Sequence, residues 1–216
     1  MTAVMKLRLK FIKAGEMRWL SHLEISRAWR RIVARAGLPV LYSEGFSPHP
    51  KIALSSALAV GIGSAAEYAD IMLAEPVPGD QALERINLYA PPGLKANAAR
   101  AMDLNTPTLG SSIKFVDYRL AALREIAAAD IAKLDSSENI PGELSVISVD
   151  YTPNETAVTF RLPVETKFSA VILSMEQSLG LQSDLRTIDR AAQWVQIDGG
   201  LVDPIDVGPA SEGKNG

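Results

Sequence analysis

The order of apolar and polar residues predicts an α+β protein. Segments with period-two alternation and segments with helical spacing follow each other as β-α-β-β-α-β in both parts of the 216-residue chain, with one extra strand in the first part. A polar stretch with proline and glycine, residues 105–112, reads as a linker between the two series. This order is typical of tandem ferredoxin-like (split βαβ) halves, with antiparallel sheets and helices on one face. We therefore expect halves at residues 1–104 and 113–200, followed by a disordered tail at 201–216.

The first strand is predicted at residues 4–12, where apolar side chains alternate with Lys6, Arg8 and Lys10. Period-two alternation indicates a strand with one buried face. We expect the three cations to form a solvent-facing basic surface on the other face.

A helix is predicted to start after Ser21, which forms a capping box with Glu24, and to stop at Gly37. Its core-facing positions recur at helical spacing and are Ile25, Trp29, Ile32, Val33 and Ala36. Its arginines, expected on other faces, are Arg27, Arg30, Arg31 and Arg35.

The rest of the first half is predicted from alternation and turn residues. Its expected elements are strands at 38–44 and 51–60 around a loop at 45–50, a strand at 67–73, a helix at 79–90 capped by Asp80, and an irregular strand ending at 104. The second half is expected to hold strands at 113–120, 143–151, 156–163 and 192–198, with helices at 124–133 and 168–179.

The distribution of charge suggests an anionic partner. The net charge is −3, but residues 1–60 carry ten basic and three acidic side chains, a net charge of +7, which leaves −10 for the remainder. Such a split favours a basic surface on the first half. The arginines of the predicted helix could bind RNA phosphates, dock an acidic protein, or simply be solvated.

Composition excludes several classes of chemistry. Without cysteine the chain forms no disulfide and supplies no thiolate to a nucleophilic, zinc or iron–sulfur site. No spacing typical of metal ligands or of a phosphate-binding glycine loop is present, so no metal and no cofactor is expected. The longest uncharged run has 15 residues and no signal-peptide core precedes the first strand. We expect a cytoplasmic protein that does not enter a membrane.

The two histidines are the candidates for catalysis. His22 holds the first position of the predicted helix, where a neutral imidazole could bind a phosphate or act as a general base; alternatively, it packs half-buried on the first strand. His49 lies between two prolines, in a stiff extended loop suited to recognition. Together they could form the acid and base of a metal-independent ribonuclease.

The loop before His49 contains further candidates for binding. These are Ser43, Glu44, Phe46 and Lys51, together with His49 itself. For Phe46 we expect packing beneath the loop, with stacking on a base as the alternative.

The motifs of the first 75 residues resemble the DUF2344 family of radical SAM-linked proteins. They are a strand of the form F-x-K-x-G, then "RWLSHLE", a helix with A-x-R-R, "AGLP", "YSEGFSPHPK" and a closing "EYAD". The family motif covers Ser21, His22, Tyr42, Ser43, Glu44, Gly45, Phe46, Pro48, His49, Pro50 and Lys51, with no roles assigned. The match is close over residues 4–75 and loose beyond them.

This resemblance implies an accessory partner of a separate radical SAM enzyme, connected with RNA or ribosome modification. We therefore expect a protein, not itself an enzyme, that binds or presents RNA or another anionic substrate through its basic first half. The alternatives are the metal-independent endoribonuclease that uses His22 and His49, and a module that binds only protein.

Overall fold

The computed structural model describes residues 3–135, 143–181 and 184–207. It is a mixed α/β protein with mostly antiparallel strand pairing and five α-helices in these residues. The chain divides into two compact units, the first formed by Met1–Ser112 together with Val195–Gly216 and the second by Ile113–Trp194. The chain thus leaves the first unit at residue 112 and returns to it near the C-terminus.

The first unit contains a sheet in which β1 lies between β4 and β3, and β2 pairs with β3. Its strands are β1 (Met5–Lys13), β2 (Ile52–Leu54), β3 (Gly63–Leu73), β4 (Ala96–Met102) and β9 (Gly200–Val202). Its helices are α1 (His22–Arg35), α2 (Gly79–Tyr89) and α3 (Leu109–Ser112), with the 3-10 segments η1 (Gly15–Trp19), η2 (Pro92–Leu94) and η3 (Pro204–Asp206).

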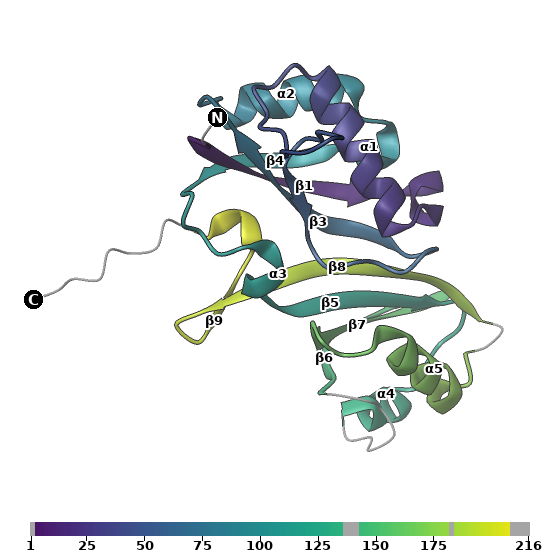
Figure 1. Cartoon of the computed structure of the whole chain (residues 1–216). Helices are drawn as coiled ribbons and strands as arrows, with labels where there is room; N and C mark the ends of the chain where they lie inside the picture. The colour runs from purple at the N-terminus through teal and green to yellow at the C-terminus, as the bar shows by residue number, and fades with distance from the viewer. Residues whose placement is uncertain (1–2, 136–142, 182–183, 208–216) are drawn as a thin grey trace, which may run out of the picture. The chain divides into compact units, whose positions relative to one another are not determined.

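Helices α1 and α2 cover one face of this sheet (Figure 1). The alternating apolar residues of β1 pack under them, and the rings of Phe11 and Trp29 meet with centroids 4.6 Å apart. All five α1 positions predicted to face the core are buried. The prediction from helical spacing is therefore confirmed for this helix.

Both ends of α1 are closed by specific hydrogen bonds. The capping box is confirmed, since the Ser21 hydroxyl accepts from the Glu24 amide and the Glu24 carboxylate accepts from the Ser21 amide. At the other end the guanidinium of Arg85, from α2, donates to the carbonyls of Ala36 and Gly37. Arg85 thereby satisfies carbonyls that a helix end leaves without partners and ties α1 to α2.

The predicted cap of the second helix was wrong. The residue before α2 is Pro78, and no side chain caps the helix, so Asp80 lies inside the first turn. An acidic side chain there still interacts favourably with the helix dipole.

The expectation of a solvent-facing cationic surface on β1 was also wrong. Lys6 and Arg8 are 6% and 0% exposed. The Lys6 ammonium donates to the carbonyls of Leu104 and Thr106 at 3.1 and 2.5 Å. Arg8 donates to the Pro204 carbonyl at 3.0 Å. The segment after β4 and the returning C-terminal segment therefore cover these cations.

The segment expected to form a disordered tail instead contains β9 and η3 over residues 200–206. The Asp203 carboxylate accepts hydrogen bonds from the Tyr68 hydroxyl at 2.8 Å and from the Lys10 ammonium at 2.5 Å. It also caps η3 by accepting from the Ile205 amide at 3.0 Å. One carboxylate thus ties this segment to β1 and β3, while residues 208–216 lie outside the described part of the chain.

The second unit repeats the element order of the first. Its elements are β5 (Ile113–Ala122), α4 (Ala128–Asp135), β6 (Ser145–Thr152), β7 (Glu155–Pro163), α5 (Phe168–Leu179) and β8 (Leu185–Ile197), the last of which ends in the first unit. The strand order is β8-β5-β7-β6. Strand β8 begins at Leu185, earlier than the predicted 192–198. The prediction missed its first half because a charged residue, Arg190, occupies a buried position there, so polar and apolar residues do not alternate regularly.

Candidate functional site

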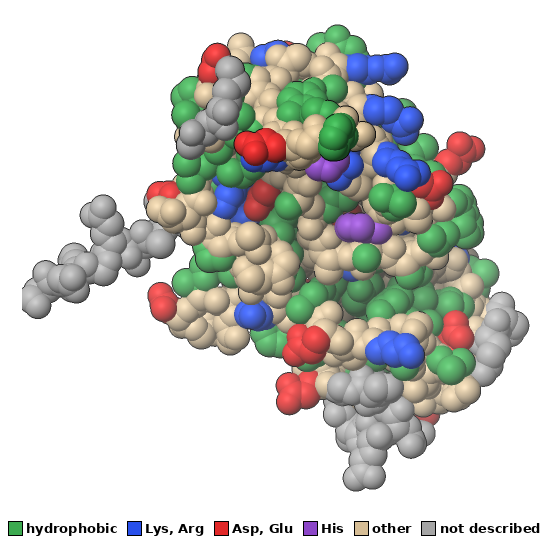
Figure 2. Space-filling view, viewed as in Figure 1, with side chains coloured by type: hydrophobic (Ala, Val, Ile, Leu, Met, Phe, Trp, Pro, Cys, Tyr) green, Lys and Arg blue, Asp and Glu red, His purple; other side chains and the backbone are tan. Residues whose placement is uncertain are grey.

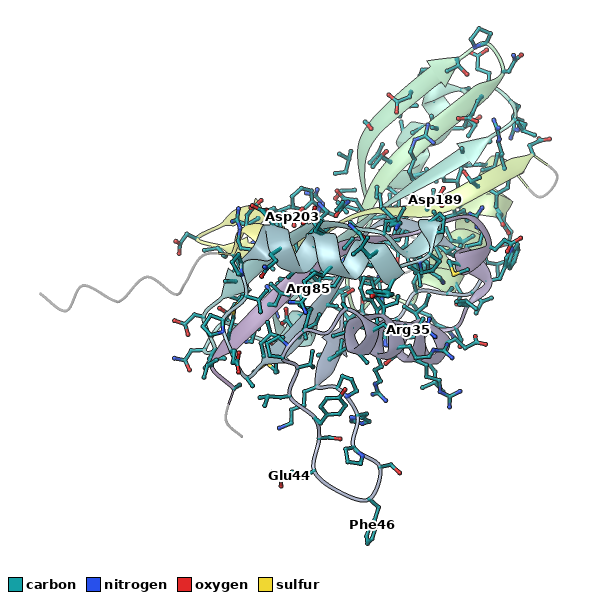
Figure 3. The ribbon with its side chains drawn as sticks, turned by 90° about the horizontal axis from the view of Figure 1, so that it is seen from above. Arg35, Glu44, Phe46, Arg85, Asp189 and Asp203 are labelled. Carbon is teal, nitrogen blue, oxygen red and sulfur yellow. The ribbon has the colours of Figure 1, made fainter. Side chains whose placement is uncertain are left out.

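Residues 41–51 form a projecting loop rather than the strand expected at 38–44. Two backbone hydrogen bonds close it, from Lys51 to Leu41 at 2.7 Å and from Ser43 to His49 at 2.8 Å. The amide of Leu41 also donates to the Met72 carbonyl of β3 at 2.9 Å. The loop is therefore anchored at its base on the sheet, and Figure 3 shows it reaching away from the unit.

Ser43 and His49 form a second closure inside this loop. The His49 amide donates to the Ser43 hydroxyl oxygen at 3.1 Å, and that oxygen lies 2.9 Å from His49 Nδ1. A hydroxyl oxygen has two lone pairs, so besides accepting from the amide it can either donate to Nδ1 or accept from Nδ1–H, according to the tautomer of His49. In both tautomers the contact holds the imidazole against the arm of the loop that carries Ser43.

Phe46 occupies the tip of the loop and is 110% exposed, with Glu44 also exposed on one arm (Figure 3). The expectation that Phe46 packs beneath the loop was wrong. Gly45 before it adopts φ +121°, a conformation that L side chains rarely adopt, which helps turn the loop. The loop extends too far from the sheet for its tip to find apolar neighbours, and it presents an aromatic ring to solvent.

His22 begins α1 and is exposed. The hydrogen bonds from Ser21, first from its side chain and then from its backbone, lower the pKa of Glu24. The capping box therefore places a carboxylate of the chain itself beside the Ser21 cap of α1. The ring of His22 borders a very small cavity that Lys13 and Glu67 also line.

Three of the four predicted α1 arginines, Arg27, Arg31 and Arg35, are exposed at successive turns, and we call them the basic row. Within the described residues neither Arg31 nor Arg35 makes an ion pair. Arg30 differs because it is half-buried and its Nε atom is buried without a hydrogen-bond partner among those residues.

Figure 2 shows the histidines and the cations of α1 on one face of the first unit. Both histidines are visible there, and Lys and Arg side chains follow the edge formed by α1. Lys51, at the base of the loop, is exposed as well. The predicted binding residues thus lie on α1 and on the 41–51 loop, whereas the cations of β1 are used inside the fold.

A groove that the sequence did not predict lies on the flank of α1 that faces the end of α2. It is lined by Met17, Leu20, Ala28, Arg31, Ile32, Arg35, Tyr89, Pro91 and Leu94 and has a volume of about 400 Å³. A second hollow of about 380 Å³ shares Met17 and Pro91 with it. The lining residues come from three separate segments of the chain, so no local pattern predicts the groove. The one sign of it in the sequence is an aromatic residue, Tyr89, close before two consecutive prolines.

The described residues hold no group of three or more histidine, aspartate or glutamate side chains that could bind a metal ion. None of their helices is long and apolar enough to span a membrane.

The protein thus consists of two α/β units. The surface of the first unit carries a basic helix, α1, and a projecting loop at residues 41–51. The chain belongs to the DUF2344 family, described as uncharacterized proteins conserved in bacteria, which matches residues 6–166. The comparison with curated proteins found no match.

One solved structure, the archaeal box H/ACA sRNP Nop10–Cbf5 complex, superposes with a TM-score of 0.42 at 12% identity. The superposition covers 85% of this chain and 46% of the matched chain in that complex, so this chain spans less than half the length of the matched chain. So distant a likeness carries no argument about function.

Proposed function

We propose that this protein is a non-catalytic accessory that binds RNA, or another anionic substrate, for a separate radical SAM enzyme. The observation that carries the proposal is the basic row, whose members Arg31 and Arg35 have no ion-pair partner within the described residues. Exposed cations without acidic neighbours remain available to a phosphate backbone.

The dimensions of the surface suit a short stretch of nucleic acid. Arg27 and Arg35 are eight residues apart, which is about 12 Å along a helix axis. That length corresponds to roughly three phosphates of one strand at duplex spacing. The exposed ring of Phe46 adds a stacking surface, and the exposed imidazole of His49 adds a hydrogen-bonding group.

The part assigned to a radical SAM partner rests on the resemblance of the N-terminal motifs to radical SAM-linked proteins. The 216 residues contain no cysteine, so they supply no thiolate ligand to an iron–sulfur cluster. We place both proteins in the cytoplasm, whose reducing conditions a cysteine-free chain suits. As part of the same proposal we assign each unit to the ferredoxin-like class, which the order β4-β1-β3-β2 and the order β8-β5-β7-β6 support.

RNA affinity as a function of salt tests the proposal. We expect the wild-type protein to bind a fluorescein-labelled twelve-residue RNA with an affinity that falls steeply as salt rises. Replacing Arg27, Arg31 and Arg35 by alanine should reduce the slope of log K against log salt by about 2, at about 0.7 per phosphate contact.

A control variant removes the same charge elsewhere. Lys114, Lys167 and Arg186 are exposed in the second unit, and their replacement by alanine should leave the slope near the wild-type value. Equal slopes for the wild type and the basic-row variant, or an equal loss in the control, would overturn the proposal.

A metal-independent endoribonuclease is the second candidate. The observation that favours it is the presence of both histidines on one face (Figure 2).

A further inference from the structure

The groove beside α1 combines an aliphatic floor with a cationic rim. Met17, Leu20 and Ala28 are partly buried and pack against the core, yet still line the groove. Arg31 and Arg35 stand one turn apart along one side, and the half-exposed Tyr89 lies at the end of α2. At about 400 Å³ the groove has the size of a site for one or two side chains or a small ligand.

The walls of the groove are held by close backbone packing. The Ala14 amide donates to the Gly93 carbonyl at 2.9 Å. A Cβ atom at Gly93 would lie 2.3 Å from the Ala14 carbonyl oxygen and 2.7 Å from Met17 Cγ, so only glycine allows this approach. Pro91 and Pro92 restrict the backbone of the same wall. The groove is therefore formed before any partner arrives.

We propose that this groove binds a segment of a partner protein in which apolar side chains are flanked by aspartate or glutamate. The apolar side chains would cover the aliphatic floor, and the carboxylates would pair with Arg31 and Arg35. Arginine pairs with carboxylates through two parallel hydrogen bonds, so two arginines one turn apart favour two acidic residues. Among the described residues that line the groove none is acidic, and Glu16 lines only the adjoining hollow.

A nucleotide fits the same groove less well. Apart from the hydroxyl of Tyr89, no floor side chain carries a group that could hydrogen-bond to the edge of a base. Burying base edges without partners costs free energy, whereas an aliphatic side chain loses nothing there. The aliphatic floor therefore selects protein over RNA, even though the rim alone would accept either.

This inference does not depend on RNA binding. Arg27 belongs to the basic row but does not line the groove, whereas Ala28 lines the groove and carries no charge. The two surfaces share Arg31 and Arg35, so an acidic segment in the groove is expected to displace RNA from that part of the row. Variants at positions 27 and 28 separate the two proposals.

The test is selection of binding peptides followed by affinity measurement. A displayed library of random dodecapeptides is selected against the wild-type protein, and the strongest peptide is resynthesised with a fluorescent label. We expect the selected sequences to combine Leu, Ile, Val or Met with flanking Asp or Glu. Ala28→Trp, which fills the groove, and the double variant R31E/R35E should each weaken binding of that peptide at least tenfold.

Matched controls keep the test decisive. Ala34→Trp places the same side chain on an exposed position of α1 outside the groove, and Arg27→Glu reverses a charge outside it. Both should bind the peptide like the wild type, and circular dichroism should show that all variants are folded. Selected peptides without acidic residues, or peptides that bind Ala28→Trp as well as the wild type, would overturn the inference. Loss of RNA binding in Ala28→Trp would instead assign the groove to RNA.

Discussion

Arg8 and Asp70 form a buried bidentate ion pair between directly opposed residues of β1 and β3, with N–O distances of 2.7 and 2.8 Å. The second unit has the corresponding pair with the charges exchanged. Asp117 on β5 and Arg161 on β7 are also directly opposed and meet at 2.6 and 2.8 Å. The first and third strands of each unit are thus joined by one arginine and one aspartate at equivalent places.

Removing one member of the pair in the first unit should be strongly destabilising. Asp70→Ala leaves the fully buried Arg8 guanidinium without its counter-charge, and we expect a loss of about 3–5 kcal/mol in the free energy of unfolding. Urea unfolding measures this loss. Asp206→Ala is the control, since its ion pair with Arg100 is more than half exposed on both sides and should contribute less than about 1 kcal/mol. Similar losses in the two variants would show that burial does not distinguish these pairs.

The contact between Tyr68 and Asp203 predicts a loss of stability at alkaline pH. Burial, and then the negative charge of Asp203, raise the pKa of Tyr68 above its ordinary value. Above about pH 10 the unfolded chain loses this proton while the folded chain keeps it, so the free energy of unfolding falls by up to about 1.4 kcal/mol per pH unit.

Urea unfolding between pH 8 and pH 11 checks this expectation. Tyr68→Phe should remove that part of the alkaline decline, because its side chain has no proton to lose. Tyr151→Phe, at a half-exposed position, should decline like the wild type. An unchanged alkaline decline in Tyr68→Phe would contradict the assignment.

Phe46 should matter for binding and not for stability. Because its side chain is fully exposed, Phe46→Ala should change the free energy of unfolding by less than about 0.5 kcal/mol. Loss of a base–aromatic stack should weaken binding of a twelve-residue RNA by about 1–3 kcal/mol, that is, roughly 5- to 150-fold. Phe46→Trp keeps an aromatic surface and should retain most of the affinity. Wild-type affinity in Phe46→Ala would remove the loop tip from the RNA site.

The role of the histidines can be decided by incubation with RNA in the presence of a chelator. If the protein only binds, labelled bacterial RNA remains intact, and His49→Ala changes affinity alone. Cleavage by the wild type that His49→Ala abolishes while RNA binding is kept would establish the endoribonuclease. Ser43→Ala serves as the matched variant, since it removes only the hydroxyl that contacts Nδ1 of His49.

The sequence predicted the part of the site on α1 better than the part on the 41–51 loop. The capping box and the buried face of α1 follow from residues at most four positions apart, so the exposed positions of Arg27, Arg31 and Arg35 could be inferred. The prolines around His49 indicated a stiff loop. Phe46 is exposed because the loop projects away from the sheet. No residue pattern within 45–50 indicates how far the loop projects, so the exposure of Phe46 could not be predicted.

The sequence by itself determined most of the order of helices and strands, the start and end of α1, and the family motif, because these depend on backbone preferences and neighbouring side chains. It did not predict the projecting loop at residues 41–51 or strand β9. Only the tertiary structure decided which cations reach solvent. Lys6 and Arg8 alternate with apolar residues as an exposed row would, yet their partners lie 98 and 196 residues further along the chain, at Leu104 and Pro204. A buried cation must find carbonyls or carboxylates in place of water, and in this protein the chain brings them from distant segments.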